Sequence, residues 1–302
     1  MSTEALRWRI GLIGYGEVGR ILAEDLRARD LAVSAYDVKL AQPDAAAALE
    51  DHAAEHGVRL AESHADAAAG ADLLISAVTA SQTVAAAQAA CAGLKAEAFL
   101  LDFNSASPGA KSRAADSVNA AGGRYVEGAV MTSVPPYRIR VPLLLGGPSA
   151  RALEAPLQAL GFDARVASDH LGVASATKMC RSVMIKGLEA MVIESFTAAR
   201  HYGVEDALIA SLKETFPGVD WEQQAAYFFQ RVIEHGRRRA EEMREAAQTM
   251  REAGLVPWSA EGTAGRQAWV AELAAAGVFG ARSLDWRVAA DRVLAQLRES
   301  PR

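Results

Sequence analysis

The chain has 302 residues, of which 51% are hydrophobic and 23% charged, values typical of a folded protein with two ordinary domains. Its formal net charge of -5 argues against nucleic acid or an anionic membrane as the main partner, because both select clustered positive charge. We therefore expect a small-molecule substrate, with no nucleic-acid or membrane partner.

Cysteine content and the first residues indicate the compartment. Cys91 and Cys180 are too few for a disulfide framework or a CxxC metal site. Residues 1–14 carry charges beside a short apolar run, which argues against a signal peptide or a membrane span. These features predict a cytoplasmic protein with reduced thiols.

From residue 9 to about residue 165, short apolar runs rich in β-branched residues alternate with alanine-rich stretches. This alternation is typical of a parallel sheet with crossover helices. The expected strands are Arg9–Ile13, Ala32–Tyr36, Leu73–Val78, Ala98–Asp102, Tyr125–Val130, Pro142–Leu145 and Ala164–Ala167.

After Gly172 the strand patterns stop and helical patterns follow. The stretch Val173–Tyr202 lacks proline, and as a helix it is long enough to connect two domains. Further helices are expected at Val204–Thr215, Trp221–Glu252, Thr263–Ala275 and Trp286–Glu299. The prediction is an α/β domain with a doubly wound sheet of Rossmann type, residues 1–168, followed by an all-α domain, residues 169–302.

A glycine motif joins the first expected strand to a helix. Gly14 permits a tight turn, Gly16 lets backbone amides approach a pyrophosphate, and Gly19 allows the helix to pack closely on the strand. The helix N-terminus adds partial positive charge. The residues expected to bind a dinucleotide here are Gly14, Tyr15, Gly16, Glu17, Val18 and Gly19.

Asp37 follows the second expected strand at the offset where dinucleotide-binding domains carry an acid. Its carboxylate is suited to accept hydrogen bonds from the adenosine ribose hydroxyls and would repel a 2′-phosphate, so NAD is expected as the cofactor. The neighbouring Lys39 weakens this discrimination and leaves NADP open. The simpler alternative is a solvated acid at a strand end.

Three segments in the expected order resemble the 3-hydroxyisobutyrate and 6-phosphogluconate dehydrogenase superfamily, the β-hydroxyacid dehydrogenases. The opening segment of residues 11–19 is similar to that family's glycine turn. Residues 102–108 match its Asp-x-Ser-Thr-x-x-Pro motif, with Asn104 and Ser105 in the polar positions. Gly172 and Lys178 match its Gly-x-x-x-x-x-Lys motif, and residues 178–190 and 235–243 look closer to a branch related to 6-phosphogluconate dehydrogenase.

The resemblance implies reversible hydride transfer between a nicotinamide cofactor and a small hydroxy acid or its oxo form, with Lys178 as general acid and base. The chemistry independently requires one group that accepts the hydroxyl proton and returns it in the reverse direction. From the residues alone, a single lysine in a helix is usually solvated. Val78, Thr79 and Asn104 are expected near the cofactor.

Two departures from the family pattern concern the substrate. Ser182 stands where the family usually has asparagine, and the family's Ser-Gly-Gly is replaced by Met131-Thr132-Ser133, so the usual substrates do not carry over. Arg181 is suited to bind a carboxylate or phosphate, or to pair with Glu194 or Asp169. The residues expected to contact substrate are Ser105, Met131, Thr132, Ser133, Arg181 and Ser182.

Several alternatives stay open. His52 and His56 share a helix face, but no third ligand is in view, so no metal is expected. His235 and Arg237 fit a solvated helix face better than a partner's active site. Competing functions are imine reduction, oxidative decarboxylation of a sugar acid, and NAD sensing without turnover. A homodimer is expected because the C-terminal helices carry a surplus of large apolar residues: Trp221, Phe228, Phe229 and Trp258.

Overall fold

The computed structural model describes residues 7–299 and divides into two compact units, residues 1–179 and 180–302. The charged residues that spoke against a signal peptide fall partly within residues 1–6, which lie outside the described residues. Within the described range no helix is long and apolar enough to span a membrane. The boundary expected at residue 168 precedes the helix α8 (Val173–Tyr202), whereas the structural division falls inside that helix.

The first unit contains one eight-stranded sheet in the order β3-β2-β1-β4-β5-β6-β7-β8. All neighbouring strands are parallel except β6 and β7. The strands are β1 (Arg9–Ile13), β2 (Ala32–Tyr36), β3 (Arg59–Leu60), β4 (Leu73–Ser76), β5 (Phe99–Asp102), β6 (Arg124–Val130), β7 (Leu143–Gly146) and β8 (Ala164–Ser168).

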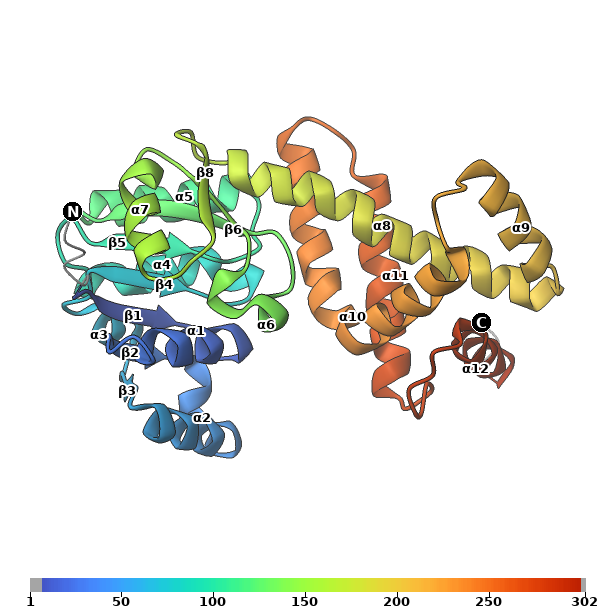
Figure 1. Ribbon diagram of the computed structural model, residues 1–302, viewed down its shortest axis with the longest axis horizontal. Helices are drawn as coiled ribbons and strands as arrows, with labels where there is room; N and C mark the ends of the chain where they lie inside the picture. Colours follow the sequence, from blue (N-terminus) through green and yellow to red (C-terminus); the bar gives the residue numbers. More distant parts are fainter. Residues whose placement is uncertain (1–6, 300–302) are drawn as a thin grey trace. The chain divides into compact units, whose positions relative to one another are not determined.

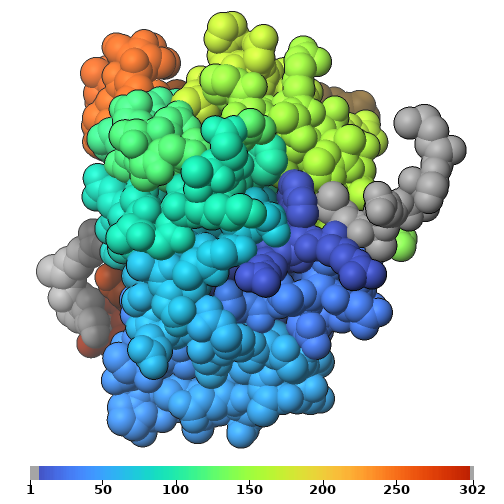
Figure 2. Space-filling model, turned by 90° about the vertical axis from the view of Figure 1, so that its left-hand side faces the viewer, coloured from blue at the N-terminus to red at the C-terminus, as the bar shows by residue number. Residues whose placement is uncertain are grey.

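The helices of the first unit lie beside the strands of this sheet (Figure 1). They are α1 (Glu17–Arg27), α2 (Pro43–His56), α3 (His64–Ala68), α4 (Thr83–Ala90), α5 (Pro108–Ala120), α6 (Val134–Tyr137) and α7 (Ala150–Ala159), with short 3-10 turns η1 (Val38–Ala41), η2 (Ala80–Gln82), η3 (Cys91–Gly93) and η4 (Arg138–Arg140). Figure 2 views the chain from the left-hand side of Figure 1, with the blue residues of the first unit at the bottom and its green residues above them.

The central strands β1, β4 and β5 are almost wholly buried, because apolar clusters cover the sheet on both faces. Successive side chains of a strand point to opposite faces. Leu12 accordingly belongs to one buried cluster and Ile13 to the other, and Leu101 and Leu100 divide in the same way. This two-sided burial is the arrangement that parallel sheets require, and the predicted doubly wound Rossmann-type domain is confirmed.

One strand departs from the parallel pattern read from the sequence: β7 runs antiparallel to β6. The connection from β6 to β7 contains only the four-residue α6 and the turn η4, too little for a usual helical crossover. The two-residue strand β3 was also missed, because a strand that short carries no readable alternation.

The second unit is all-helical, as predicted. It contains most of α8, followed by α9 (Glu205–Thr215), α10 (Trp221–Glu252), α11 (Trp258–Ala275) and α12 (Trp286–Glu299). Its core includes Phe196, whose ring centroid lies 5.0 Å from that of Trp286. Helices α10 and α11 pack so closely that a Cβ on Gly236 would lie 2.7 Å from the carbonyl oxygen of Gln267. Helix α11 begins at Trp258, earlier than the expected Thr263, and continues through Gly262.

Candidate functional site

The carboxyl ends of the parallel strands bring the predicted cofactor residues of the first unit to one edge of the sheet. Ile13 at the end of β1 is in register with Tyr36 of β2 and Ser76 of β4. Ser76 is in turn in register with Asp102 at the end of β5. The segments that follow these residues therefore leave the sheet at the same level. In open α/β sheets ligands bind at this edge, where the strand order reverses between β1 and β4.

The glycine turn after β1 has the geometry that the motif predicts. Gly14 has a φ of +90°, and a Cβ there would lie 2.4 Å from the carbonyl oxygen of Ala77. A Cβ on Gly19 would lie 2.0 Å from the carbonyl oxygen of Gly14, so glycine is required where α1 crosses the turn. By contrast, a Cβ on Gly16 would meet no protein atom within 4 Å. Open space therefore lies beside the turn at Gly16, at the start of α1.

Asp37 ties the end of β2 to this turn. One carboxylate oxygen accepts a hydrogen bond of 2.8 Å from the backbone N–H of Tyr15, and the other accepts one of 2.9 Å from the backbone N–H of Lys39. The side chain is half-buried, so lone pairs remain on both oxygens for further donors. Asp37 thus stabilises the turn in addition to the ribose contact predicted for it.

The remaining residues of the turn differ in exposure. The Tyr15 ring is fully buried, and its hydroxyl lies 2.8 Å from Nδ1 of His52. Burial raises the pKa of Tyr15 to about 12. Glu17 is exposed in the first turn of α1, and Val18 packs partly against the core.

Asn104 holds the ends of β4 and β5 together. Its Oδ1 accepts a hydrogen bond of 2.7 Å from the backbone N–H of Val78, and its Nδ2 donates one of 3.0 Å to Ser76. The side chain is buried, so its amide positions the segment at Val78 and the exposed Thr79. This internal role was not predicted, because the partner lies in a strand distant in sequence.

A buried charged cluster lies beneath the loop that carries Asn104. The carboxylate of Asp102 accepts hydrogen bonds from the Lys111 ammonium at 2.9 Å, the Tyr125 hydroxyl at 2.6 Å and the backbone N–H of Asn104 at 2.8 Å. Burial, reinforced by the charge of Asp102, holds the pKa of Tyr125 well above its usual value. The cluster fixes the start of the loop between β5 and α5.

Sequence analysis missed Lys111, although a signal was present. It is a single lysine on the helix face that also carries Ala114, Ala115 and Val118, and all four are buried. A charged residue on an otherwise apolar face predicts a buried partner.

Lys178 lies at the end of the first unit and contacts the same loop. Its Nζ donates a hydrogen bond of 2.5 Å to Oγ of Ser105, which follows Asn104 directly. Both side chains are partly buried. The structure therefore brings together Ser105, from the motif of residues 102–108, and Lys178, from the motif of residues 172–178.

Glu127 of β6 fixes the start of α8 and was also missed. Its carboxylate is fully buried and accepts hydrogen bonds from the backbone N–H of Ala174 at 3.0 Å and the hydroxyl of Ser175 at 2.9 Å. A negative charge at a helix N-terminus is favourable. Gly146 of β7 pairs with Glu127, and a Cβ at Gly146 would lie 2.2 Å from the Glu127 carboxylate. The glycine therefore leaves room for the Glu127 side chain. The first turns of α8, and hence Lys178, are held in the first unit.

The segment Met131–Ser133, predicted to bind substrate, leaves the end of β6. Met131 is half-buried, Thr132 is exposed and Ser133 is half-buried before α6. The segment after α6 is anchored by Arg138, which has a φ of 54° and binds Glu24 at 2.6 Å and Asp25 at 2.9 Å. These acids belong to α1, so the altered loop is tied to the helix that follows the glycine turn.

The two other predicted substrate residues belong to the second unit. Ser182 is buried and accepts a hydrogen bond of 3.1 Å from Lys186, whose ammonium lies 2.8 Å from Glu242. Arg181 is exposed. Its two suggested partners pair elsewhere: Glu194 with Arg266 at 2.6 Å, and Asp169 with His170 at 3.6 Å.

Two family models match the chain. The NAD binding domain of 6-phosphogluconate dehydrogenase matches residues 9–153, and a domain of unknown function, DUF1932, matches residues 199–270. Among solved structures, a conserved hypothetical protein from Sinorhizobium meliloti 1021 is 38% identical, with a TM-score of 0.77 over 96% of this chain and 98% of that protein.

Two further solved structures carry more informative names. A conserved protein of unknown function, described as structurally similar to 3-hydroxyacid dehydrogenases, is 27% identical with a TM-score of 0.67, over 88% of this chain and 99% of its own. The 3-hydroxyisobutyrate dehydrogenase of Mycobacterium tuberculosis shares the fold at 16% identity, with a TM-score of 0.63 over 95% and 99% of the two chains. The chain belongs to the 3-hydroxyisobutyrate and 6-phosphogluconate dehydrogenase superfamily.

The family and its structural relatives indicate an NAD(P)-binding oxidoreductase like the hydroxyacid dehydrogenases. The residues present fit a nicotinamide dinucleotide. Open space at Gly16 adjoins the N-terminus of α1, where backbone N–H groups attract phosphate. Asp37 at the end of β2 has acceptor capacity left for hydroxyl groups.

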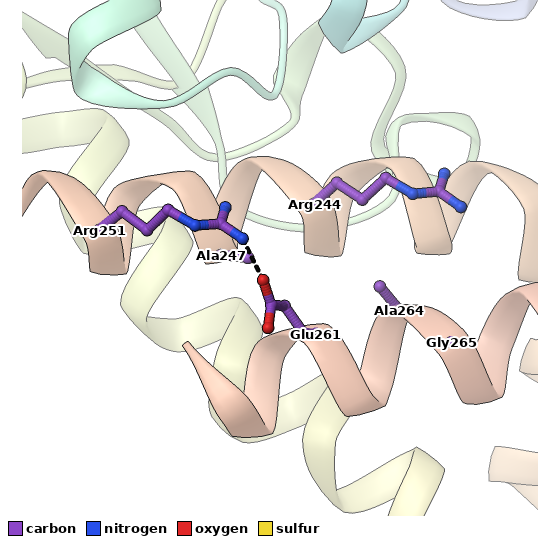
Figure 3. Close-up of a pocket in the computed structure, with 6 residues that line it drawn as sticks. All are labelled: Arg244, Ala247, Arg251, Glu261, Ala264 and Gly265. Atoms are coloured by element: carbon purple, nitrogen blue, oxygen red, sulfur yellow. Dashed lines mark hydrogen bonds and ion pairs between the residues drawn. The ribbon is translucent and has the colours of Figure 1, made fainter. Parts of the chain in front are cut away.

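The second unit also contains a pocket of about 260 Å³ between α10 and α11, shown in Figure 3. Arg251 forms an ion pair there with Glu261, and Arg244 extends along α10 away from that pair. The lining includes none of the residues predicted from the sequence. His235 and Arg237, left open above, lie elsewhere on α10, where His235 is half-buried and Arg237 exposed.

Proposed function

We propose that the protein is an NAD-dependent dehydrogenase that oxidises a small hydroxy acid, or reduces its oxo form, with Lys178 as general base and general acid. The observation that carries this proposal is the 2.5 Å hydrogen bond from Lys178 to Ser105. This contact supports the proposal because the Lys178 side chain meets the loop that leaves β5, at the sheet edge where the glycine turn and Asp37 also lie.

The glycine turn and Asp37 would hold a nicotinamide cofactor, which would supply the chemistry of hydride transfer to or from the substrate carbon. The chain's own task is to move the accompanying proton. In oxidation the neutral amine of Lys178 takes the hydroxyl proton as the C–O bond becomes a carbonyl. In reduction the ammonium returns that proton to the forming alkoxide. Ser105 accepts from Lys178 and keeps its own hydroxyl proton to donate, so it is suited to orient the substrate oxygen.

Cofactor selection is assigned to Asp37. Its carboxylate is held by two backbone N–H groups, which fix its position at the end of β2. A fixed negative charge favours ribose hydroxyls and opposes a 2′-phosphate, so NAD is proposed over NADP.

The altered segment Met131–Ser133 and Ser182 are proposed to select the substrate. Thr132 and Ser133 offer hydroxyl groups where the family has glycine amides, and Arg181 is an exposed guanidinium for an anionic group. The proposal of an acidic substrate rests on these two hydroxyl groups and on the guanidinium of Arg181.

The test is a screen of purified protein against hydroxy acids and sugar acids with oxidised cofactor, and against oxo acids and imines with reduced cofactor. The absorbance of the reduced nicotinamide is the readout. We expect turnover with a hydroxy acid or its oxo form, and faster turnover with NAD than with NADP. Turnover confined to imines would contradict the assignment of the reaction. Cofactor binding without turnover on any substrate would favour a sensor.

A further inference from the structure

A cluster of two histidines and a glutamate joins α1 to α2 outside the residues assigned above. His52 and His56 lie one helical turn apart in α2, and Glu24 lies in α1. One ligand atom from each residue lies within 4.8 Å of the others. All three residues are half-buried. The folded chain thus supplies the third ligand that the two histidines lack in the sequence.

The separations are close to those of a transition-metal site. Tetrahedral zinc holds nitrogen and oxygen ligands at about 2.0–2.2 Å, which places neighbouring donors about 3.3–3.6 Å apart. Nε2 of His52 and Oε1 of Glu24 are already 3.0 Å apart. His56 needs a side-chain shift of roughly 1–1.5 Å to complete three ligands, well within a rotation of its partly exposed ring.

Groups around the cluster resemble the outer contacts that orient metal ligands. A metal-bound histidine usually donates its second ring N–H to a neighbouring oxygen, and ligating carboxylates are themselves hydrogen-bonded. Here Nδ1 of His52 lies 2.8 Å from the Tyr15 hydroxyl, and the second oxygen of Glu24 accepts from Arg138 at 2.6 Å. With Nε2 on a metal, Nδ1 would carry the proton and donate it to Tyr15.

The local charge permits a cation. Arg138 opposes one, but it is shared between the carboxylates of Glu24 and Asp25. A third carboxylate, Glu55, lies 4.0 Å from Nε2 of His56. Arg27 adds a second guanidinium, whose Nε donates a hydrogen bond of 3.1 Å to the backbone carbonyl of His56, so three acidic groups face two guanidinium groups around the cluster.

A hydrogen-bond network alone accounts for only part of this arrangement. It explains the contacts from His52 to Tyr15 and to Glu24. The spacing of four residues on α2 places the His56 ring beside that of His52, with 4.5 Å between their centroids, so both imidazoles face the same point. Two adjacent imidazoles repel each other when protonated, whereas a shared metal ion uses both as neutral ligands.

We propose that Glu24, His52 and His56 bind one divalent transition-metal ion, with zinc as the best match to two nitrogens and one oxygen. The ion would clamp α2 onto α1. It would also fix the ring of Tyr15, whose backbone N–H is held by Asp37 in the glycine turn. The proposed role of the metal ion is structural, and this proposal does not depend on the oxidoreductase activity.

The test is titration of chelator-treated full-length protein with cobalt(II), whose visible absorption reports coordination, followed by displacement with zinc. The variants are His56→Gln, which removes one ligand, and His201→Gln as a control on an exposed histidine of α8. We expect one equivalent bound by the wild type and the control, and at least tenfold weaker binding by His56→Gln. Tyr15→Phe should weaken binding about tenfold through the lost outer contact.

Thermal unfolding with and without zinc gives an independent readout, because a ligand that binds only the folded state raises the unfolding temperature. We expect a rise in the wild type and in His201→Gln, and a smaller one in His56→Gln. Equal cobalt affinity in His56→Gln and wild type, or no saturable binding in the wild type, would overturn the proposal. In that case the cluster is a hydrogen-bonded contact between two helices.

Discussion

The carboxylate of Asp102 is held inside the first unit by Lys111, Tyr125 and the backbone N–H of Asn104. Removing one partner of a buried ion pair leaves the other charge uncompensated. We therefore predict that Lys111→Met lowers the free energy of unfolding by about 3–5 kcal/mol. Urea unfolding followed by circular dichroism measures the loss.

The matched control for this substitution is Lys95→Met. Lys95 pairs with Asp72 at 2.6 Å, but its side chain is 54% exposed. An exposed pair of this kind contributes less than about 1 kcal/mol. Similar losses for both variants would show that burial does not strengthen the Asp102 pair.

Asp37 permits a second prediction at the residue scale. Asp37→Asn keeps an acceptor for the turn but removes the charge that opposes a 2′-phosphate. We expect the KM for NADH to rise roughly tenfold or more, since a hydrogen bond to a charged group contributes about 1.5–3 kcal/mol. The ratio of NADPH to NADH turnover should rise with it. An unchanged ratio would show that Asp37 serves the turn alone.

Individual residues differ in how far the sequence determines their roles. Gly14, Gly19 and Asp37 could be predicted because strand, turn and helix adjoin along the chain. The hydrogen bond from Val78 to Asn104 could not, because it joins two loops brought together by the sheet. The contact of Lys178 with Ser105 was implied only by the family resemblance.

At the scale of elements, α8 depends on a residue from another element. Glu127 of β6 accepts from Ala174 and Ser175 at the first turn of α8. Replacing a capping acceptor by alanine costs about 1–2 kcal/mol. We predict that Glu127→Ala loses at least this much stability in chemical unfolding, and that turnover falls because Lys178 lies one turn further along. Glu97→Ala, an exposed acid paired with Arg124, is the control.

The length and type of the elements were largely predictable, but their directions were not. The helices at Val173–Tyr202, Trp221–Glu252 and Trp286–Glu299 have the predicted bounds. The reversed β7 was missed because an apolar run carries no mark of its direction. The early start of α11 was missed because Gly262 normally weakens a helix, whereas here its neighbours Ala260 and Thr263 are buried in the helical unit.

At the scale of the whole molecule, most of the large apolar residues from which a homodimer was expected are buried within one chain. Trp221, Phe228 and Phe229 are buried in the core of the second unit, so they do not indicate a partner. Exposed apolar side chains remain in the same unit: Met184 at 72%, Met191 at 62% and Trp258 at 78%. Met184 and Met191 are seven residues apart on one face of α8.

We propose that these exposed residues form a self-association surface. Light scattering on a size-exclusion column should then give twice the mass of one chain. The double variant Met184→Glu and Met191→Glu should shift the protein to a monomer with unchanged circular dichroism. A wild-type protein that is monomeric at micromolar concentration would contradict this proposal.

The central claim is that Lys178 moves the proton, and the Lys178→Met variant tests it most directly. We predict that this variant binds reduced cofactor with unchanged affinity, measured by nicotinamide fluorescence, while kcat falls by about 10²–10⁴-fold. Lys213→Met, at an exposed position of α9, should keep wild-type values. A Lys178→Met enzyme that retains kcat within a few-fold of wild type would contradict the account.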